Sequence, residues 1–321
     1  MTCRRSAGVT AAIRISAIVY AIVMAAWPLL GIAAGKPHIA VVYPDIREPY
    51  RSIFMQIIEG IRSEPHTRIN TYLLQNNNNV HRLQRQLRKH HDKAVIALGT
   101  QALESVKSAS ELPIVVGAVL MQPAQRTDNV SGITMLPEPS LLFSTLKEMR
   151  PSAIRIAVVY NPDINEQLIT LASKSAYDHG LELLTHAATD LASAARIYRT
   201  LLTSGEIDAL WLPQDSTTVD SKIILPLVLE HAWKHNITVF SNNLAHVERG
   251  ALFALYPDNI AMGRRLARLS LSRLEDDAAH PPHIATLVDL NIAVNTRTAT
   301  HLGLNFGAEQ KQSFHLVFPA P

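Results

Sequence analysis

Polar residues directly after apolar runs are the positions in this chain that could hold a small molecule. Thr100 and Gln101 follow the run Ala94–Leu98, and Asp215 and Ser216 follow another such run. A hydroxyl and free backbone N–H groups at the start of a helix can bind an anion, but they equally form an ordinary helix cap. Hydrogen-bonding residues around Asp215 are denser than one cap requires, which favours ligand contact there.

Asn161 and Tyr43 also stand at the ends of apolar runs. Asn161 precedes Pro162, the usual arrangement of a helix cap. Tyr43 ends the first apolar run, His38–Tyr43. Open α/β sheets bind ligands beyond the carboxyl ends of their strands, so we include both residues among the predicted ligand contacts.

Motifs for catalysis and cofactor binding are absent from the sequence. There is no phosphate loop, no G-x-G-x-x-G and no G-x-S-x-G. His231 and His235 are four residues apart, but the glutamate of H-E-x-x-H is missing. A hydrolase using Asp215 or Asp258 is the enzyme alternative, yet no nucleophile–base pair supports it. We therefore predict no catalytic residue, no cofactor and no metal site.

The first 34 residues are typical of a secretory signal peptide. Three arginines, Arg4, Arg5 and Arg14, precede an apolar run that continues to Ala34, and small residues follow near Gly35. This order of charge, apolar run and small residues predicts export to the periplasm with cleavage of the leader. An uncleaved membrane anchor is the alternative, because about 20 apolar residues can span a bilayer.

Removal of this leader changes how charge and cysteine content are interpreted. The 321-residue chain has 30 Lys and Arg against 27 Asp and Glu, and the leader contains three of the arginines. The mature chain therefore has no excess charge, and we predict no nucleic-acid partner. Cys3, the single cysteine, lies in the leader, so no disulfide or lipid-attachment cysteine remains.

Apolar runs alternate with amphipathic stretches from Pro37 onward. Strand-like runs such as Arg68–Leu74 and Ile114–Val119 are separated by helix-like stretches such as Tyr50–Arg62. Strands separated by helices indicate βαβ units, which form parallel sheets covered on both faces. The fold class predicted is α/β, with two Rossmann-like lobes, each on a parallel sheet.

The β-α pattern restarts after a polar, Pro-containing break at Gln122–Leu136. The same five-residue sequence, Ile-Ala-Val-Val-Tyr, begins both halves, at Ile39 and at Ile156. We predict two lobes facing a shared cleft, joined by a hinge of several strands near Met121–Val130 and Tyr256–Asp258. The predicted division is residues 1–34 as signal peptide, 37–128 plus about 258–285 as the first lobe, and 129–257 plus about 286–321 as the second.

Several segments of the second half follow a recognisable order. They are Asn129–Thr134, Ile156–Pro162, Leu212–Thr217, Val239–Phe240, Val247–Leu252, Asp258, Gly263–Arg264 and Asn295–Leu304. Together they resemble the tryptophan/tyrosine-type ABC transporter substrate-binding family over about residues 129–306. The resemblance implies a type I periplasmic-binding-protein fold that closes about a hinge, and Thr134, Asn161, Asp215 and Asp258 as ligand contacts.

Two departures from the family bear on ligand charge. Family members usually have an acidic residue where this chain has Met135, and an aspartate where it has Asn243. An unpaired charge in a closed cleft is costly, so these losses leave Asp215 as the main partner for an ammonium group. We therefore predict a ligand other than a standard amino acid, neutral or aromatic, with Asn243 among its contacts.

The predicted function is capture of a small molecule for an ABC-type uptake system, with a permease and an ATPase as partners. The alternative is an envelope sensor of the same fold that signals to a receptor or kinase. A transcription regulator of similar fold is disfavoured, because a leader occupies the N-terminus in place of a helix-turn-helix.

Overall fold

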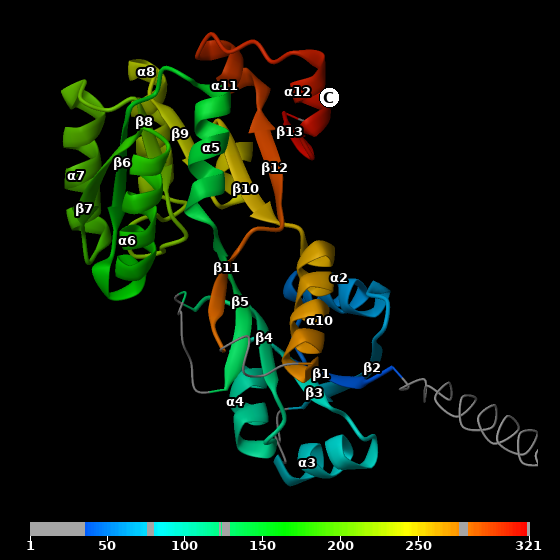
Figure 1. The fold of residues 1–321 in the computed structure, drawn as a ribbon. Helices are drawn as coiled ribbons and strands as arrows, with labels where there is room; N and C mark the ends of the chain where they lie inside the picture. The colour runs from blue at the N-terminus through cyan, green and yellow to red at the C-terminus, as the bar shows by residue number, and fades with distance from the viewer. Residues whose placement is uncertain (1–35, 76–79, 122, 124–128, 276–281, 320–321) are drawn as a thin grey trace, which may run out of the picture. The chain divides into compact units, whose positions relative to one another are not determined.

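The computed structural model describes residues 36–75, 80–121, 123, 129–275 and 282–319. The predicted signal peptide lies outside the described residues. The described chain contains two sheets, each flanked by helices on both faces (Figure 1). None of the helices in these ranges has the length and apolar content needed to cross a membrane.

The first sheet is built from strands that pair in parallel, in the order β11-β5-β4-β3-β1-β2. Their bounds are β1 His38–Pro44, β2 Arg68–Leu74, β3 Ala94–Leu98, β4 Ile114–Val119, β5 Val130–Pro137 and β11 Ile284–Leu287. The helices around it are α2 Tyr50–Ser63, α3 Val80–Lys89, α4 Thr100–Ala109 and α10 Asn259–Glu275.

Alternation along β1 explains why both faces of the first sheet are covered. Ile39 and Val41 are buried with residues of α2 and α10, while Ala40 and Val42 are buried with residues of α3 and α4. Successive side chains of a strand point to opposite faces, so a continuous apolar run requires cover on each side.

The second sheet has the order β13-β12-β10-β9-β8-β6-β7, and β12 runs antiparallel to β10. Its strands are β6 Arg155–Tyr160, β7 Glu182–Ala187, β8 Ala209–Leu212, β9 Thr238–Ser241, β10 Phe253–Pro257, β12 Leu290–Asn295 and β13 Leu316–Phe318. The accompanying helices are α5 Pro139–Met149, α6 Pro162–Asp178, α7 Leu191–Ser204, α8 Ile224–His235, α9 Leu244–Glu248, α11 Thr296–His301 and α12 Ala308–Ser313.

Helices α2 and α10 cross at very close range because each presents a glycine. A Cβ atom on Gly60 would lie 2.1 Å from the carbonyl oxygen of Ile260. A Cβ on Gly263 would lie 2.1 Å from that of Ile57. Backbone therefore packs on backbone at this crossing, which fixes the position of the first turn of α10.

Three segments of the described chain pass between the two sheets. They join β5 to α5, β10 to α10, and β11 to β12. Neighbouring crossings are hydrogen-bonded: Glu138 N–H donates to the Leu287 carbonyl, and Asp258 N–H donates to the Asp289 carbonyl. Tyr256–Asp258, one predicted hinge segment, lies at a crossing.

Strand β5 differs from the sequence-based expectation. The interval Gln122–Leu136 was expected to be a break and residues from 129 to belong to the second lobe, yet β5 pairs with β4 in the first sheet. The predicted hinge segment Met121–Val130 therefore links two strands of one sheet, and residues 122 and 124–128 of it lie outside the described residues. The run Ile284–Val294 likewise divides into β11 and β12, which belong to different sheets.

Candidate functional site

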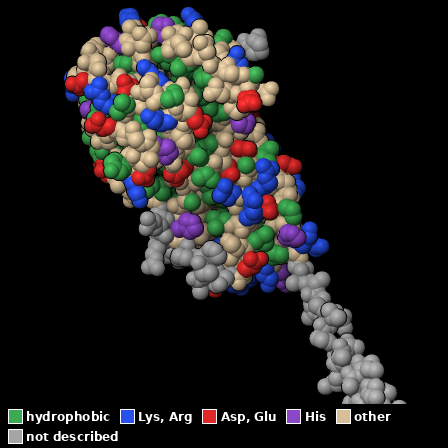
Figure 2. Space-filling model, turned by 45° about the horizontal axis from the view of Figure 1, so that its top comes forward, with side chains coloured by type: hydrophobic (Ala, Val, Ile, Leu, Met, Phe, Trp, Pro, Cys, Tyr) green, Lys and Arg blue, Asp and Glu red, His purple; other side chains and the backbone are tan. Residues whose placement is uncertain are grey.

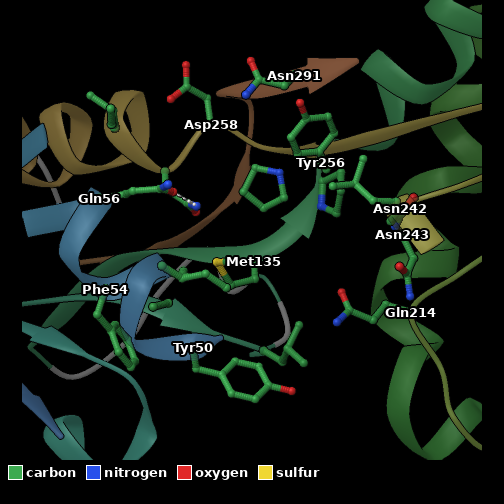
Figure 3. A pocket seen from close by; sticks show the side chains of 18 residues that line it. Tyr50, Phe54, Gln56, Met135, Gln214, Asn242, Asn243, Tyr256, Asp258 and Asn291 are labelled. Atoms are coloured by element: carbon green, nitrogen blue, oxygen red, sulfur yellow. Dashed lines mark hydrogen bonds between the residues drawn. The ribbon is translucent and has the colours of Figure 1, made fainter. Parts of the chain in front are cut away.

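A cavity of about 750 Å³ lies where strands of both sheets end. Its walls come from β4 and β5 of the first sheet, β10 and β12 of the second, the loops after β8 and β9, and the first turns of α2, α9 and α10 (Figure 3). The carboxyl ends of parallel strands are the usual place for ligands in open α/β sheets. The lining residues are Tyr50, Ile53, Phe54, Gln56, Ala118, Leu120, Met135, Pro137, Gln214, Asn242, Asn243, Leu244, Tyr256, Pro257, Asp258, Asn259, Ile260 and Asn291.

The wall on the first-sheet side is mostly apolar. Both Phe54 and Tyr50 line the cavity. Phe54 is buried, whereas Tyr50 is 64% exposed. Ala118 has a φ of 54°, in the left-handed region that alanine rarely adopts, where the pairing of β4 with β5 shifts register. A residue held in such a conformation beside a cavity is typical of a binding site.

The wall on the second-sheet side presents side-chain amides, and Asn242 is the most deeply buried of them. Its exposed fraction is 8%, and its Oδ1 accepts a hydrogen bond from Trp211 Nε1 at 3.4 Å. Its Nδ2 is buried without a protein partner. Gln214 and Asn243 are exposed beside it, on the side of the cavity opposite Phe54 and Met135 (Figure 3).

Asp258 is the one residue of the lining that carries a charged side chain. It precedes α10, and its Oδ1 accepts the N–H of Ala261 at 2.9 Å, as an N-cap does. Burial, and secondly the negative charge of Asp258, raise the pKa of the Tyr256 hydroxyl. The carboxylate thus contributes negative potential to the cavity.

Buried hydrogen bonds behind Asn242 and Asn243 stabilise the part of the cavity wall that presents side-chain amides. The Ser241 hydroxyl donates to the Leu212 carbonyl at 3.1 Å and accepts from Asn243 N–H at 3.2 Å. His246 Nδ1 lies 2.7 Å from the same hydroxyl oxygen. The direction of this contact depends on the tautomer of His246, because the single hydroxyl proton of Ser241 can go to Leu212 or to Nδ1. Burial lowers the pKa of His246 to about 4, with Arg249 adding to the effect.

The family model of ABC transporter substrate binding proteins matches residues 59–310. The chain belongs to this family. Its members bind substrates for ABC transporters and are not enzymes, which confirms the prediction that the chain performs no catalysis. No curated protein matches significantly.

Solved structures with a similar fold include three bacterial proteins. A ligand-free, open substrate binding protein with adhesive properties from Clostridium difficile has a TM-score of 0.62 and 19% identity, covering 88% of this chain and 99% of that one. An ABC domain from Streptococcus pneumoniae in complex with L-Trp has a TM-score of 0.51 and 18% identity, covering 88% and 100%. A conserved domain protein from Vibrio cholerae has a TM-score of 0.51 and 20% identity, covering 88% and 99%. These likenesses confirm the predicted type I periplasmic-binding-protein fold.

Two of the predicted ligand contacts of this substrate-binding protein, Asn243 and Asp258, lie on the cavity. Tyr43 lines a separate hollow of about 50 Å³ beside β1. Thr100 and Gln101 are exposed at the start of α4 and do not line the cavity.

Asp215 and Asn161 are engaged inside the second sheet's helical layer and do not line the cavity. Oδ2 of Asp215 accepts from Asn161 N–H at 2.8 Å and from Asn165 Nδ2 at 3.2 Å. Its Oδ1 accepts from the N–H and the hydroxyl of Thr217, at 2.9 and 2.6 Å. Asn161 Oδ1 in turn caps α6 at Asp163 N–H. Asp215, predicted as the main carboxylate for a ligand, therefore does not line this cavity, whereas Asp258 does.

Thr134 and Ser216 are likewise not cavity residues. Thr134 is fully buried in β5, where its hydroxyl donates to the Val119 carbonyl at 3.2 Å and accepts from the N–H of Leu136. It holds the irregular pairing of β4 with β5. Ser216 is exposed in the loop after β8.

Sequence reasoning missed the aromatic side chains and most amides of the cavity. Tyr50 and Phe54 fall in an amphipathic helix, where an aromatic residue reads as core, and Asn291 falls inside an apolar run. Asn242 stands beside Asn243 at a strand end, so the rule that pointed to Asn243 would have found it too. Among the described residues, no group of His, Cys, Asp and Glu could hold a metal ion.

Proposed function

We propose that this protein is an exported solute-binding protein that captures a small molecule in the cavity between the two sheets and delivers it to an ABC permease driven by an ATPase. The observation that supports this most is the composition of the cavity wall. Strand ends and helix starts from both sheets contribute to one site, which is how a two-lobed binding protein encloses a ligand.

The segments that pass between the sheets supply the mechanism of capture. Two of them directly adjoin the cavity: β5 ends at the lining residue Pro137, and β10 leads through Pro257 to Asp258. Dihedral changes confined to such segments let two rigid layers close on a ligand and exclude water. A ligand that binds only the folded state stabilises it by about 2.7 kcal/mol at a hundredfold excess over its Kd.

Binding is tested by a thermal-shift screen of the purified protein against aromatic amino acids, aromatic amines and acids, purines, sugars and peptides, followed by calorimetry of the hits. Tryptophan belongs in the panel because the Streptococcus pneumoniae structure contains L-Trp. We expect one chemical class to raise the melting temperature in a dose-dependent way.

A matched pair of variants links any hit to the cavity. Tyr50→Ala removes an exposed tyrosine that lines the cavity, and Tyr177→Ala removes an 83% exposed tyrosine on α6. Neither side chain has a hydrogen bond in the described structure, so both variants should fold normally. We expect Tyr50→Ala to weaken the hit about tenfold or more and Tyr177→Ala to leave it unchanged. Absence of any hit, or equal effects of the two variants, would contradict the proposed function at this cavity.

A further inference from the structure

The charged side chains of the described cavity wall are of one sign, negative. Among the 18 described residues that line it, Asp258 is acidic and none is Lys, Arg or His. The remaining polar groups are the phenols of Tyr50 and Tyr256 and the amides of Gln and Asn. A group of fixed charge in a closed site needs a partner of opposite charge, and the side chains of this wall offer such a partner to a positive group on a ligand and none to a negative one.

Asp258 retains capacity to bind a ligand while it caps α10. The structure shows one hydrogen bond to its carboxylate, from Ala261 N–H to Oδ1, whereas an ionised carboxylate has about four acceptor positions. Its side chain lies beside Asn291 and Tyr256 at the cavity (Figure 3). A protonated amine placed here gains a charge-assisted hydrogen bond.

The rings around the cavity suit the same kind of ligand. Phe54 and Tyr50 come from one helix and Tyr256 from β10, so aromatic faces approach from both sheets. Such faces stack on a flat ring and also attract a cation through their quadrupole. A flat ring that carries an amine uses both properties.

Asn242 adds a hydrogen-bond donor without a charge. Its Nδ2 is buried and has no protein partner, although a buried polar group left unpaired costs free energy. A neutral acceptor such as a carbonyl oxygen on the ligand would satisfy it once closure turns this amide toward the cavity. A carboxylate would find no Lys, Arg or His side chain on the described wall and would lie near the negative charge of Asp258.

We propose that the cavity selects an aromatic amine that carries no carboxylate, with the protonated amine on Asp258 and the ring among Tyr50, Phe54 and Tyr256. This inference rests on the proposed function, and it narrows that function to one class of solute. Met135 and Asn243 line the cavity as neutral side chains, so Asp258 is the single charged side chain available to the amine. A zwitterionic amino acid matches this charge less well than its decarboxylated or amidated form.

Calorimetry at pH 7 with three indoles tests the selectivity. Tryptamine has the ring and the amine, L-tryptophanamide adds a neutral amide, and L-tryptophan adds a carboxylate in the same position. We expect both amines to bind at least about tenfold tighter than L-tryptophan, and indole-3-acetate to bind more weakly than all three. The same comparison with tyramine, tyrosinamide and tyrosine repeats the test with a smaller aromatic ring.

Asp258→Asn is the variant that isolates the charge. Asparagine caps a helix about as well as aspartate, so the melting temperature of the free protein should stay within about one degree. We expect the affinity for tryptamine to fall about tenfold or more and the preference over L-tryptophan to disappear.

The outcomes separate this inference from the proposed function. If L-tryptophan or a ligand without an amine binds tighter than the matched amines, and Tyr50→Ala weakens it, the protein is a binding protein and the selectivity for amines is wrong. If tryptamine binds equally to Asp258→Asn and to the unchanged protein, the role of Asp258 is wrong. If nothing in the broader screen binds, the proposed function itself fails.

Discussion

Asp215 and Asp258 occupy similar places in the second sheet and have opposite environments. Asp215 follows β8 and Asp258 follows β10, two parallel strands with β9 between them. Asp215 is 4% exposed and accepts four hydrogen bonds from three neighbouring residues. Asp258 is half-buried on the cavity and accepts one.

The difference shows that two acidic residues at strand ends can retain very different acceptor capacity for a ligand. Donors from Asn161, Asn165 and Thr217 consume the acceptor capacity of Asp215, and the group ties the loop after β8 to the start of α6. Asp258 meets a single helix N–H and retains its other acceptor positions. The number of local donors therefore separates the structural aspartate from the one that is available to a solute.

Removal of the Asp215 carboxylate should give the largest loss of stability. Asp215→Ala leaves two buried and two part-buried donors without their acceptor, and we expect the free energy of unfolding to fall by about 4 kcal/mol. Asp215→Asn keeps the shape of the side chain, but its NH2 group replaces one oxygen and faces two hydrogen-bond donors. We therefore expect about half that loss. Urea unfolding followed by circular dichroism measures both. A change below about 0.5 kcal/mol for Asp215→Ala would show that the Asp215 carboxylate has no structural role.

Low pH should weaken the support beneath the amide wall. The folded-state pKa of His246 is about 4, below its ordinary 6.5, so the unfolded chain binds a proton that the folded chain rejects. The stability is complete above pH 6.5 and falls as the pH drops through 6.5 towards 4. The loss from this residue reaches about 3 kcal/mol at pH 4.

His246→Asn is the matched control for this pH effect, because an amide can donate to Ser241 but does not titrate in this range. We expect the difference in unfolding free energy between pH 7 and pH 4 to be about 3 kcal/mol smaller in the variant. Equal pH dependence in the two proteins would show that His246 is protonated without cost in the folded state.

A similar contrast separates the parts of the fold that could be predicted from the sequence from those that could not. The β-α order was predictable because buried parallel strands are continuous apolar runs, as in Val95–Leu98. Strand β5 escaped prediction because Ser131 and Thr134 make it look polar. Thr134 is nonetheless fully buried and hydrogen-bonded to β4 through the Val119 carbonyl. A polar residue that is satisfied by tertiary contacts cannot be distinguished from a loop residue by pattern.

The candidate site was predictable only in part for a related reason. Asn243 and Asp258 were found because they follow strands and match family segments. Tyr50 and Phe54 reach the cavity only because α2 packs against α10, a contact between distant parts of the chain. No local pattern encodes such a contact. Asp215 was predicted as a ligand contact because hydrogen-bonding residues cluster after its strand and because it matches a family segment. Its donors Asn161 and Asn165 come from a segment 50 or more residues away, so a local pattern does not reveal them.

The crossing of α2 and α10 offers a change that should disturb one aspartate and spare the other. Gly263→Ala places a methyl group 2.1 Å from the Ile57 carbonyl oxygen, so the helices must separate. We expect a loss of about 2 kcal/mol in unfolding free energy and weaker ligand binding, because α10 begins beside Asp258. Gly307→Ala is the control, since a Cβ there meets open space at an ordinary φ of −65°. Unchanged binding in Gly263→Ala would show that the cavity does not depend on this crossing.

Truncation of Asp258 should cost the least stability while affecting binding the most. Asp258→Ala removes the acceptor of Ala261 N–H, and loss of one N-cap costs about 1 kcal/mol. Asp258→Asn retains the cap, so its unfolding free energy should match that of the unchanged protein. The two variants should nonetheless lose affinity for an aromatic amine to a similar degree, since both lack the negative charge. Because the capping role and the binding role then vary independently, a pair of unfolding curves and a pair of titrations is enough to separate them. If Asp258→Ala instead lost as much stability as Asp215→Ala, the structural role of Asp258 would exceed that of a single N-cap.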